Sequence, residues 1–324
     1  MKAYHDLVQK ILDEGVNVYN TRTNSVCRTI VGEQISFDVR EGFPALTTRK
    51  FPFKNTVGEL LGFFRGVTSA EDFRKLGCSF WDANANETKD WLKNIYRKGT
   101  DDTGNIYGKQ WTSWPAVRVA TTDKEEHYLV NHGWKYIGKT NVTCKEGYGF
   151  GIYRKHINQL ENVVRTILTN PTDRRIIVSG WNVGELDTMC LSPCHMDYRF
   201  IPFEDSKILN VVMTIRSWDV WLGSPSNIAS TAIFLQVVAR LTGYHVGKVV
   251  IQAANVHLYE NSIPAAKELL TREHFDRPIL RLSDNIKPIT NMAEIKGVFT
   301  RIEPTDITLD GYQSHDPIKV EMVA

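Results

Sequence analysis

The sequence predicts a mixed helix-and-strand domain built on one large sheet. Segments with apolar residues at helical spacing alternate along the chain with short apolar runs bounded by Gly, Pro or Asn, a pattern typical of helices packed on a sheet. The 324 residues are 42% hydrophobic, which is ordinary globular composition and argues against disordered, collagen-like and coiled-coil chains. The 39 basic and 37 acidic side chains nearly balance, which argues against a dedicated nucleic-acid-binding or membrane-surface protein.

Four helices are predicted from apolar periodicity and from the residues that stop it. They are residues 4–12 before Gly15, residues 57–64, residues 157–168 before Asn170-Pro171, and residues 227–241 before Gly243. Gly just after a helix and Pro near its end are the usual terminators. The helix over 57–64 is apolar enough to be buried, yet it contains Glu59.

Strands are predicted where short apolar runs lack helical spacing. They are expected within residues 26–48, with Gly32 and Gly42 as breaks, and at residues 175–179, 207–213 and 248–251. Residues 116–155 differ, because they are polar, rich in Lys, Gly and Tyr, and contain only short β-like pieces such as residues 127–130. We interpret 116–155 as an insertion into a single domain, 1–324, and not as a domain of its own.

Several features bear on the setting of the protein. The sequence has no run of eighteen apolar residues and no signal-peptide core at its start, so neither a membrane span nor a secretory leader is expected. The five cysteines are odd in number and lack metal-ligand spacing. We therefore expect no metal site and a reducing, cytoplasmic compartment.

The candidate chemistry starts at Cys194, which follows a proline and precedes His195. It is either an exposed nucleophile that needs a nearby positive charge or a small buried hydrophobic residue. Basic residues are available for activating a thiol or binding phosphate, although spacing alone leaves open that they are surface residues: Arg22, Arg174, Arg175 and Arg216, the last followed by Ser217.

Three further positions have a functional and a structural interpretation. A carboxylate buried in an apolar helix should have a raised pKa, but Glu59 could also face outward. Asn227 could cap a helix. His257 and Tyr259 alternate and would share one face of a strand, either at a site or at a half-buried strand edge.

Taken together, these pieces resemble the thymidylate synthase family. The resemblance covers residues 1–114 and about 155–324, and only the insertion is unmatched. The ordered segments that carry it are Glu41-Gly-Phe-Pro-Ala-Leu-Thr-Thr48, Glu59-Leu-Leu61, Tyr107-Gly-Lys-Gln-Trp111, Asp173-Arg-Arg-Ile-Ile-Val-Ser179, Trp181-Asn-Val-Gly-Glu-Leu-Asp187, Pro193-Cys-His195, Arg216-Ser217, Asp219, Asn227-Ile-Ala-Ser230 and His257-Leu-Tyr259. The resemblance implies an α+β fold with a large twisted mixed sheet, packed back to back in a homodimer.

The resemblance also implies roles. Cys194 would add to carbon 6 of dUMP, and carbon 5 would then accept a one-carbon unit from 5,10-methylenetetrahydrofolate. Glu59, Tyr107 and Asp219 would complete the catalytic set. The nucleotide would be bound by Arg22, Arg216, Ser217, Asn227, His195, His257 and Tyr259, with Arg174 and Arg175 from the partner subunit. The folate would contact Trp81, Asn84, Leu191, Asp219, Leu222, Gly223, Ser226, Tyr259 and Val323, the last in a tail that closes over the ligands.

Two departures from the family pattern shape the expected reaction. Asn84 and Ser226 stand where the family has a tryptophan and a phenylalanine on the folate, and Ile215 and the Ala253-Ala-Asn255 segment also differ. Losing two apolar walls predicts water entry, and the methylene intermediate would be hydrated. The chain therefore most resembles the phage dUMP hydroxymethylases. These enzymes produce 5-hydroxymethyl-dUMP and release tetrahydrofolate, and their product serves DNA modification. The resemblance implies a location in the host cytoplasm. The alternative is thymidylate synthase; a dCMP hydroxymethylase and an inactive nucleotide-binding protein are minor alternatives.

Overall fold

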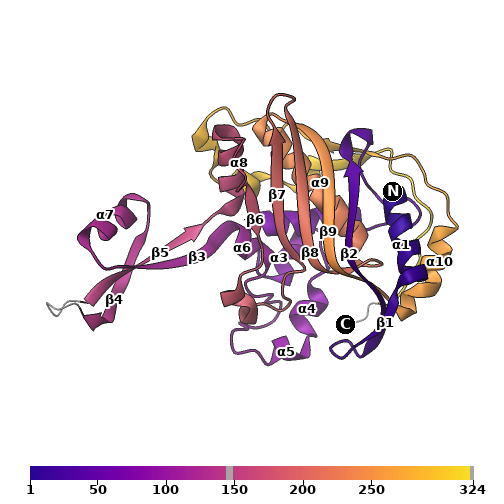
Figure 1. Cartoon of the computed structure of the whole chain (residues 1–324), viewed down its shortest axis with the longest axis horizontal. Helices are drawn as coiled ribbons and strands as arrows, with labels where there is room; N and C mark the ends of the chain where they lie inside the picture. Colours follow the sequence, from indigo (N-terminus) through magenta and orange to yellow (C-terminus); the bar gives the residue numbers. More distant parts are fainter. Residues whose placement is uncertain (144–148, 322–324) are drawn as a thin grey trace.

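The computed structural model describes residues 1–143 and 149–321, with side chains left undescribed at residues 142 and 143. A six-stranded mixed sheet in the order β1-β2-β9-β8-β7-β6 forms the centre of the molecule (Figure 1). All neighbouring strands are antiparallel except β8 and β9, which run parallel. The strands are β1 (Val16–Asn20), β2 (Ser25–Asp38), β6 (Ile177–Ser179), β7 (His195–Phe203), β8 (Ile208–Asp219) and β9 (His245–Tyr259). The mixed helix-and-strand prediction with one large sheet is confirmed.

Helices cover one face of this sheet. The long helix α9 (Gly223–Thr242) is buried along most of its length and packs on β8 and β9. The other helices are α1 (Lys2–Glu14), α2 (Phe53–Phe64), α3 (Ala70–Lys75), α4 (Asp82–Asn86), α5 (Lys89–Leu92), α6 (Tyr107–Ser113), α8 (Gln159–Thr169) and α10 (Ile263–Leu270). A two-stranded sheet of β10 (Ile279–Leu282) and β11 (Ile307–Asp310) lies in the C-terminal part.

The predicted helices are present, with small differences at their ends. The first ends at Gly15, α8 ends before Asn170, and Gly243 terminates α9 in the left-handed conformation at φ +72°. Strand β9 is longer than predicted and runs on to Tyr259, so that His257 and Tyr259 lie in the sheet. Strand β6 is an edge strand with Ile177 exposed, and the residues after Asp38 leave the sheet.

Residues 114–157 form an arm that projects from the main body (Figure 1). It contains β3 (Trp114–Ala120), α7 (Asp123–Asn131), β4 (Lys135–Thr143) and β5 (Gly149–Ile157), with the strands in the order β3-β5-β4. Its apolar cluster of Ala120, Leu129 and Tyr153 is separate from the main core. The β-like interpretation of residues 127–130 is wrong. They lie in α7, which Thr122 caps by accepting a hydrogen bond from Glu125.

Candidate active site

Cys194 is the last residue before β7 and is only partly exposed. Its backbone N–H donates to the Tyr107 hydroxyl oxygen at 2.6 Å. Its backbone carbonyl accepts a hydrogen bond from the Arg216 N–H at 3.0 Å. The nucleophile candidate is therefore held between the first residue of α6 and strand β8.

Arg216 clamps the turn that precedes Cys194. Its Nε donates to the Pro193 carbonyl at 2.9 Å and its Nη2 to the Ser192 carbonyl at 3.0 Å. Its guanidinium carbon lies 5.2 Å from the centroid of the Trp181 ring, within the range of a cation–π contact. These contacts fix a positive charge next to the thiol.

Opposing effects act on the Cys194 thiol. Burial is the larger effect and raises its pKa, while the charge of Arg216, a hydrogen bond from Tyr107 and the charge of Arg22 lower it. Arg22 reaches the site from the exposed turn between β1 and β2. Burial outweighs the other effects, and the thiol pKa stays above its usual range. Arg216, Arg22 and Tyr107 are nevertheless placed to stabilise the thiolate when it forms.

Glu59 projects from the apolar helix α2 toward this region. Its Oε1 accepts a hydrogen bond from Trp81 Nε1 at 3.1 Å, and burial raises its pKa to about 7. The inward-facing interpretation with a raised pKa is the one that the structure shows. A carboxyl with a pKa near neutrality is suited to both giving and taking a proton.

An aromatic cluster surrounds Tyr107. Its ring stacks on Phe63 at a centroid distance of 4.9 Å and meets Trp81 edge-on at 5.9 Å. Burial raises the pKa of Tyr107 well above its usual range, which keeps its proton on the hydroxyl at neutral pH. Trp81 is itself 4% exposed, so only a small part of it is open to a ligand.

His195 and Asn227 form the next part of the site. His195 is buried, its Nδ1 lies 3.0 Å from the Tyr198 hydroxyl, and burial lowers its pKa to about 4, so its imidazole is neutral at pH 7. Asn227 accepts a hydrogen bond from Trp218 Nε1 at 3.2 Å and also contacts His195. The helix-cap interpretation of Asn227 is wrong, because α9 begins at Gly223 and Asn227 lies inside it.

Asp219 and His257 are direct partners in the parallel β8–β9 ladder. Burial raises the pKa of Asp219 and lowers that of His257. Asp219 Oδ1 accepts hydrogen bonds from the Trp221 and Leu222 backbone N–H groups at 2.9 and 3.1 Å. His257 Nδ1 lies 2.8 Å from Asn255 Oδ1, and its ring is perpendicular to that of Tyr259. Ser217 pairs with Asn255 two residues earlier in the same ladder.

The remaining predicted residues divide into three groups. Leu191 and Gly223 are partly exposed, and Leu222, which is 38% exposed and bonded to Asp219 through its backbone, offers apolar surface beside that carboxylate. Arg174 and Arg175 lie on the exposed segment leading into β6, where Arg175 makes two hydrogen bonds of 2.9 Å to Asp173. Val323 lies outside the described residues.

Asn84 and Ser226, the two departures from the family pattern, are in different settings. Asn84 lies in α4 and is partly exposed. Ser226 is only 5% exposed, and its hydroxyl lies 3.1 Å from that of Thr56 in α2. The expectation that Ser226 lines the folate wall and binds water there therefore lacks support in the structure, because its hydroxyl is engaged inside the protein.

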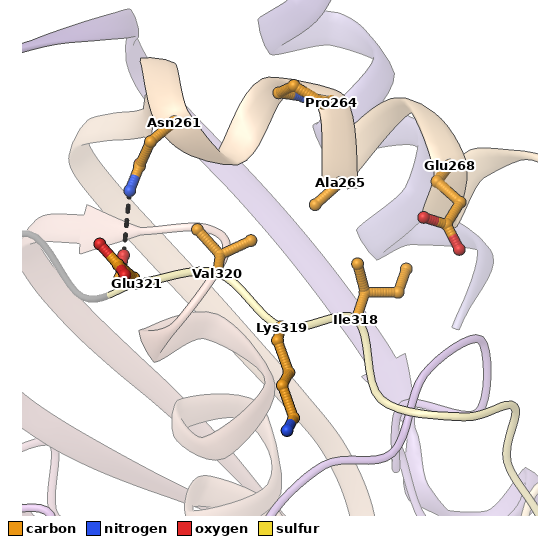
Figure 2. A pocket seen from close by; sticks show the side chains of 8 residues that line it. All are labelled: Asn261, Pro264, Ala265, Glu268, Ile318, Lys319, Val320 and Glu321. Carbon is orange, nitrogen blue, oxygen red and sulfur yellow. Dashed lines mark hydrogen bonds between the residues drawn. The ribbon is translucent and has the colours of Figure 1, made fainter.

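Residues 318–321 of the C-terminal segment lie near the end of β9. Residues 318–321 run along α10 and border a groove of about 450 Å³ (Figure 2). The side chains of Ile318 and Val320 face α10, Lys319 points away, and Asn261 Nδ2 donates to the Glu321 carbonyl at 3.0 Å. Because Asn261 follows Tyr259 by two residues, this bond brings the tail near the end of β9.

Comparisons with known proteins decide the family. The family model described as thymidylate synthase matches residues 2–324. The chain belongs to the thymidylate synthase family. It is 39% identical over 325 residues to a thymidylate synthase from Bordetella parapertussis, covering 99% of both chains, and 37% identical over 325 residues to one from Pseudomonas syringae, again covering 99% of both. A thymidylate synthase from Vibrio parahaemolyticus is 35% identical over 321 residues, 98% of both chains.

Membership in the thymidylate synthase family makes the chain a one-carbon-transferring enzyme and a transferase of nucleotide biosynthesis. The family uses dUMP and methylenetetrahydrofolate. The alignments cover nearly the whole length, so they include the arm at residues 114–157. In the described part of the chain, no helix is long and apolar enough to cross a membrane, and no group of three His, Cys, Asp or Glu side chains is placed to hold a metal ion.

Some residues that support the site by holding its other residues in place were not predicted from the sequence. Arg49 is 8% exposed, stacks over Trp221 at 4.3 Å and donates to its carbonyl, which supports the turn after Asp219. Gln110, Trp181 and Asn182 lie in segments that carry the family resemblance, but no property of the sequence assigns them partners.

Proposed function

We propose that this chain is a thymidylate synthase that converts dUMP to dTMP. The observation that carries the proposal is the clamped Cys194, with Tyr107 on one side and Arg216 on the other. The full-length similarity to thymidylate synthases supports the same conclusion. The thiolate of Cys194 adds to carbon 6 of the uracil ring, which makes carbon 5 nucleophilic, and the same thiolate leaves when the product forms.

The nucleotide is proposed to lie across the ends of β8 and β9. Arg22, Arg216 and Ser217 hold the phosphate, because guanidinium groups and a hydroxyl match its oxygens. Asn227 offers both a donor and an acceptor to the uracil edge, with neutral His195 beside it, and His257 and Tyr259 bind the sugar. An amide at residue 227, in place of a carboxylate, favours dUMP over dCMP.

Proton movements are assigned to Glu59 and Tyr107. Glu59, with a pKa of about 7, exchanges a proton with oxygen 4 of the ring, directly or through water. Tyr107, whose hydroxyl touches the Cys194 N–H, assists removal of the proton from carbon 5.

The folate site is proposed beside Asp219. The exposed side chain of Leu222 next to the Asp219 carboxylate suits a flat heteroaromatic ring that carries N–H donors, so the residues present fit methylenetetrahydrofolate, and the partly exposed Leu191 is assigned to the same site. Trp81, Asn84, Gly223 and Tyr259 complete the surroundings, and Val323 belongs to the tail. When bound, methylenetetrahydrofolate supplies the one-carbon unit and, in the synthase reaction, a hydride.

A homodimer is part of the proposal. In the single chain, Ile177, Ile201 and Phe203 are exposed on β6 and β7, and alternate residues of β8 are only half-buried. Packing two such sheets together would cover this surface. Arg174 and Arg175, exposed in the single chain, would then reach the phosphate in the partner's site.

The second candidate is a dUMP hydroxymethylase, favoured by one observation. Asn84 is a partly exposed polar residue in α4, where the family pattern has an apolar ring. The enclosed setting of Ser226 weakens that candidate, because the expected wet pocket rested on both positions.

One incubation separates the two reactions. The enzyme is mixed with dUMP and methylenetetrahydrofolate in heavy-oxygen water, and the nucleotide product is weighed. We expect unlabelled dTMP together with the absorbance of dihydrofolate. A product heavier by a labelled hydroxyl, with no dihydrofolate, would establish the hydroxymethylase instead. A parallel incubation with dCMP tests whether the enzyme prefers uracil or cytosine. Binding of dUMP without release of the hydrogen on carbon 5 would indicate an inactive nucleotide-binding protein.

A further inference from the structure

We propose that Gln110 is a positioning residue that sets the two contacts holding Cys194, the Tyr107 hydroxyl and the Arg216 guanidinium. This inference rests on the proposed role of Cys194 as the nucleophile. Gln110 lies on α6, one turn after Tyr107, and is completely buried.

Both the nitrogen and the oxygen of the Gln110 side-chain amide are hydrogen-bonded. Its Nε2 donates to the Asn105 carbonyl at 2.9 Å, and its Oε1 accepts from Asn182 Nδ2 at 2.9 Å. Its backbone carbonyl accepts from Gln159 Nε2 at 2.9 Å, and Gln159 also pairs with both backbone groups of Ser179. A buried side chain that is hydrogen-bonded through both its nitrogen and its oxygen fixes its neighbours, because a shift of either partner leaves a buried donor or acceptor unpaired.

The bond to Asn105 acts on Tyr107. Helix α6 has only seven residues and no side-chain cap at its N-terminus, so a short helix on its own would hold Tyr107 weakly. Gln110 ties the chain just before the helix to the middle of it. The Tyr107 oxygen is thereby kept at 2.6 Å from the Cys194 nitrogen.

The bond to Asn182 acts on Arg216. Asn182 follows Trp181, and the Trp181 ring lies against the guanidinium of Arg216 at 5.2 Å. Arg216 in turn holds the Ser192 and Pro193 carbonyls. If Asn182 loses its acceptor, the support under Arg216 shifts, and the charge next to the thiol moves with it.

The measurable consequence is the ionisation of the Cys194 thiol. The groups that act on the thiol are Tyr107, Arg216, Arg22 and Asp219, and burial raises its pKa. Removing the support of the first two leaves Arg22 as the remaining group that favours the thiolate, against burial and Asp219, which both disfavour it. The pH at which Cys194 becomes reactive should therefore rise.

The test uses the ligand-free, full-length protein. Cys194 alkylation by iodoacetamide is followed from pH 6 to 10, and peptide mapping by mass spectrometry identifies the modified cysteine, with Cys194→Ala as the blank. We expect Gln110→Leu to react about tenfold more slowly below the midpoint, since the thiolate is the reacting form. Gln110→Glu keeps an oxygen for Asn182 but loses the N–H donated to the Asn105 carbonyl, so it should react more slowly than the wild type and faster than Gln110→Leu. The matched control is Gln9→Leu, an exposed glutamine on α1 bonded to Asp13, which should change nothing.

A folded Gln110→Leu protein with the wild-type alkylation profile would overturn the inference. If Gln110→Leu does not fold, Asn182→Ala removes the same hydrogen bond from a partly exposed position and must raise the midpoint as well. No substrate is used, so the outcome is independent of turnover, and a wild-type protein that fails to methylate dUMP counts against the proposed function alone.

Discussion

The Trp81 indole N–H donates to the Glu59 carboxylate at 3.1 Å inside an aromatic cluster, and among the described residues no basic side chain pairs with this acid. Burial therefore dominates, and the pKa of Glu59 rises from 4.5 to about 7. The folded state binds this proton more tightly than the unfolded state does. The stabilisation this gives is complete below pH 4.5 and is lost as the pH rises through 7.

Glu59→Gln should accordingly gain stability relative to the wild type as the pH increases. The pKa shift limits the change between pH 4.5 and 8 to about 3 kcal/mol, and the partial exposure of Glu59 reduces it to about 1–2 kcal/mol. Urea unfolding of both proteins at several pH values measures this change in the difference between their free energies of unfolding. Glu87→Gln, at an exposed position, should show no such trend, and a constant difference for Glu59→Gln would contradict the raised pKa.

Cys194→Ser should lower turnover by at least about a thousandfold, since a serine hydroxyl is a far weaker nucleophile at neutral pH. Binding of dUMP should be retained within about tenfold, because the arginines that hold the phosphate are unchanged. Steady-state kinetics and calorimetry give the two quantities. Cys27→Ala, at a buried cysteine to which no role in the reaction is assigned, is the control that should keep its activity.

Mixed dimers test whether the site is shared between subunits. A Cys194→Ser chain and an Arg174→Ala, Arg175→Ala chain should each be inactive as homodimers. After unfolding and refolding together, we expect about a quarter of the wild-type activity, because half of the dimers are mixed and each has one complete site. Activity that stays at zero would place both arginines outside the partner's site.

Asn84→Trp tests water access at the proposed folate site. If the wild type forms any 5-hydroxymethyl-dUMP, an apolar ring at residue 84 should reduce its share of the product, and mass analysis of the nucleotides measures the ratio. Ser226→Phe is a poor test, because the 5% exposed site facing Thr56 has no room, and overpacking costs about 1–3 kcal/mol.

The arm should be dispensable for catalysis. We propose that the chain is one catalytic domain carrying the arm as an insertion, since Ala116 and Lys155 are paired on neighbouring antiparallel strands. Joining these two residues by Asn-Gly forms a tight hairpin. The shortened protein should keep its kcat within about threefold, because the hydrogen bonds of Gln110 and Gln159 lie on the body side of the junction. Loss of activity in a folded, shortened protein would show that the arm takes part.

The sequence predicted elements whose signal is local. Periodicity and a terminating glycine were enough for α1 and α9, and the apolar run for α2. The β-like interpretation of residues 127–130 fails because it weighs a short apolar run above the Thr122 cap and the acidic first turn of α7. The site itself draws on Arg22, Glu59, Cys194 and His257, and no spacing in the chain indicates that these meet. Family resemblance named them, while Gln110 escaped notice because its partners come together only in the folded chain.

The parallel pairing of β8 with β9 has a consequence for refolding. Strands β8 and β9 can pair only after the intervening helix α9 has formed the connection between them. Strand β2, at residues 25–38, must then pair with β9, about 200 residues later in the chain. Pairings between such distant segments form slowly. After dilution from denaturant, helical circular dichroism should therefore return well before enzymatic activity, and the lag between the two signals would time the closing of the central sheet.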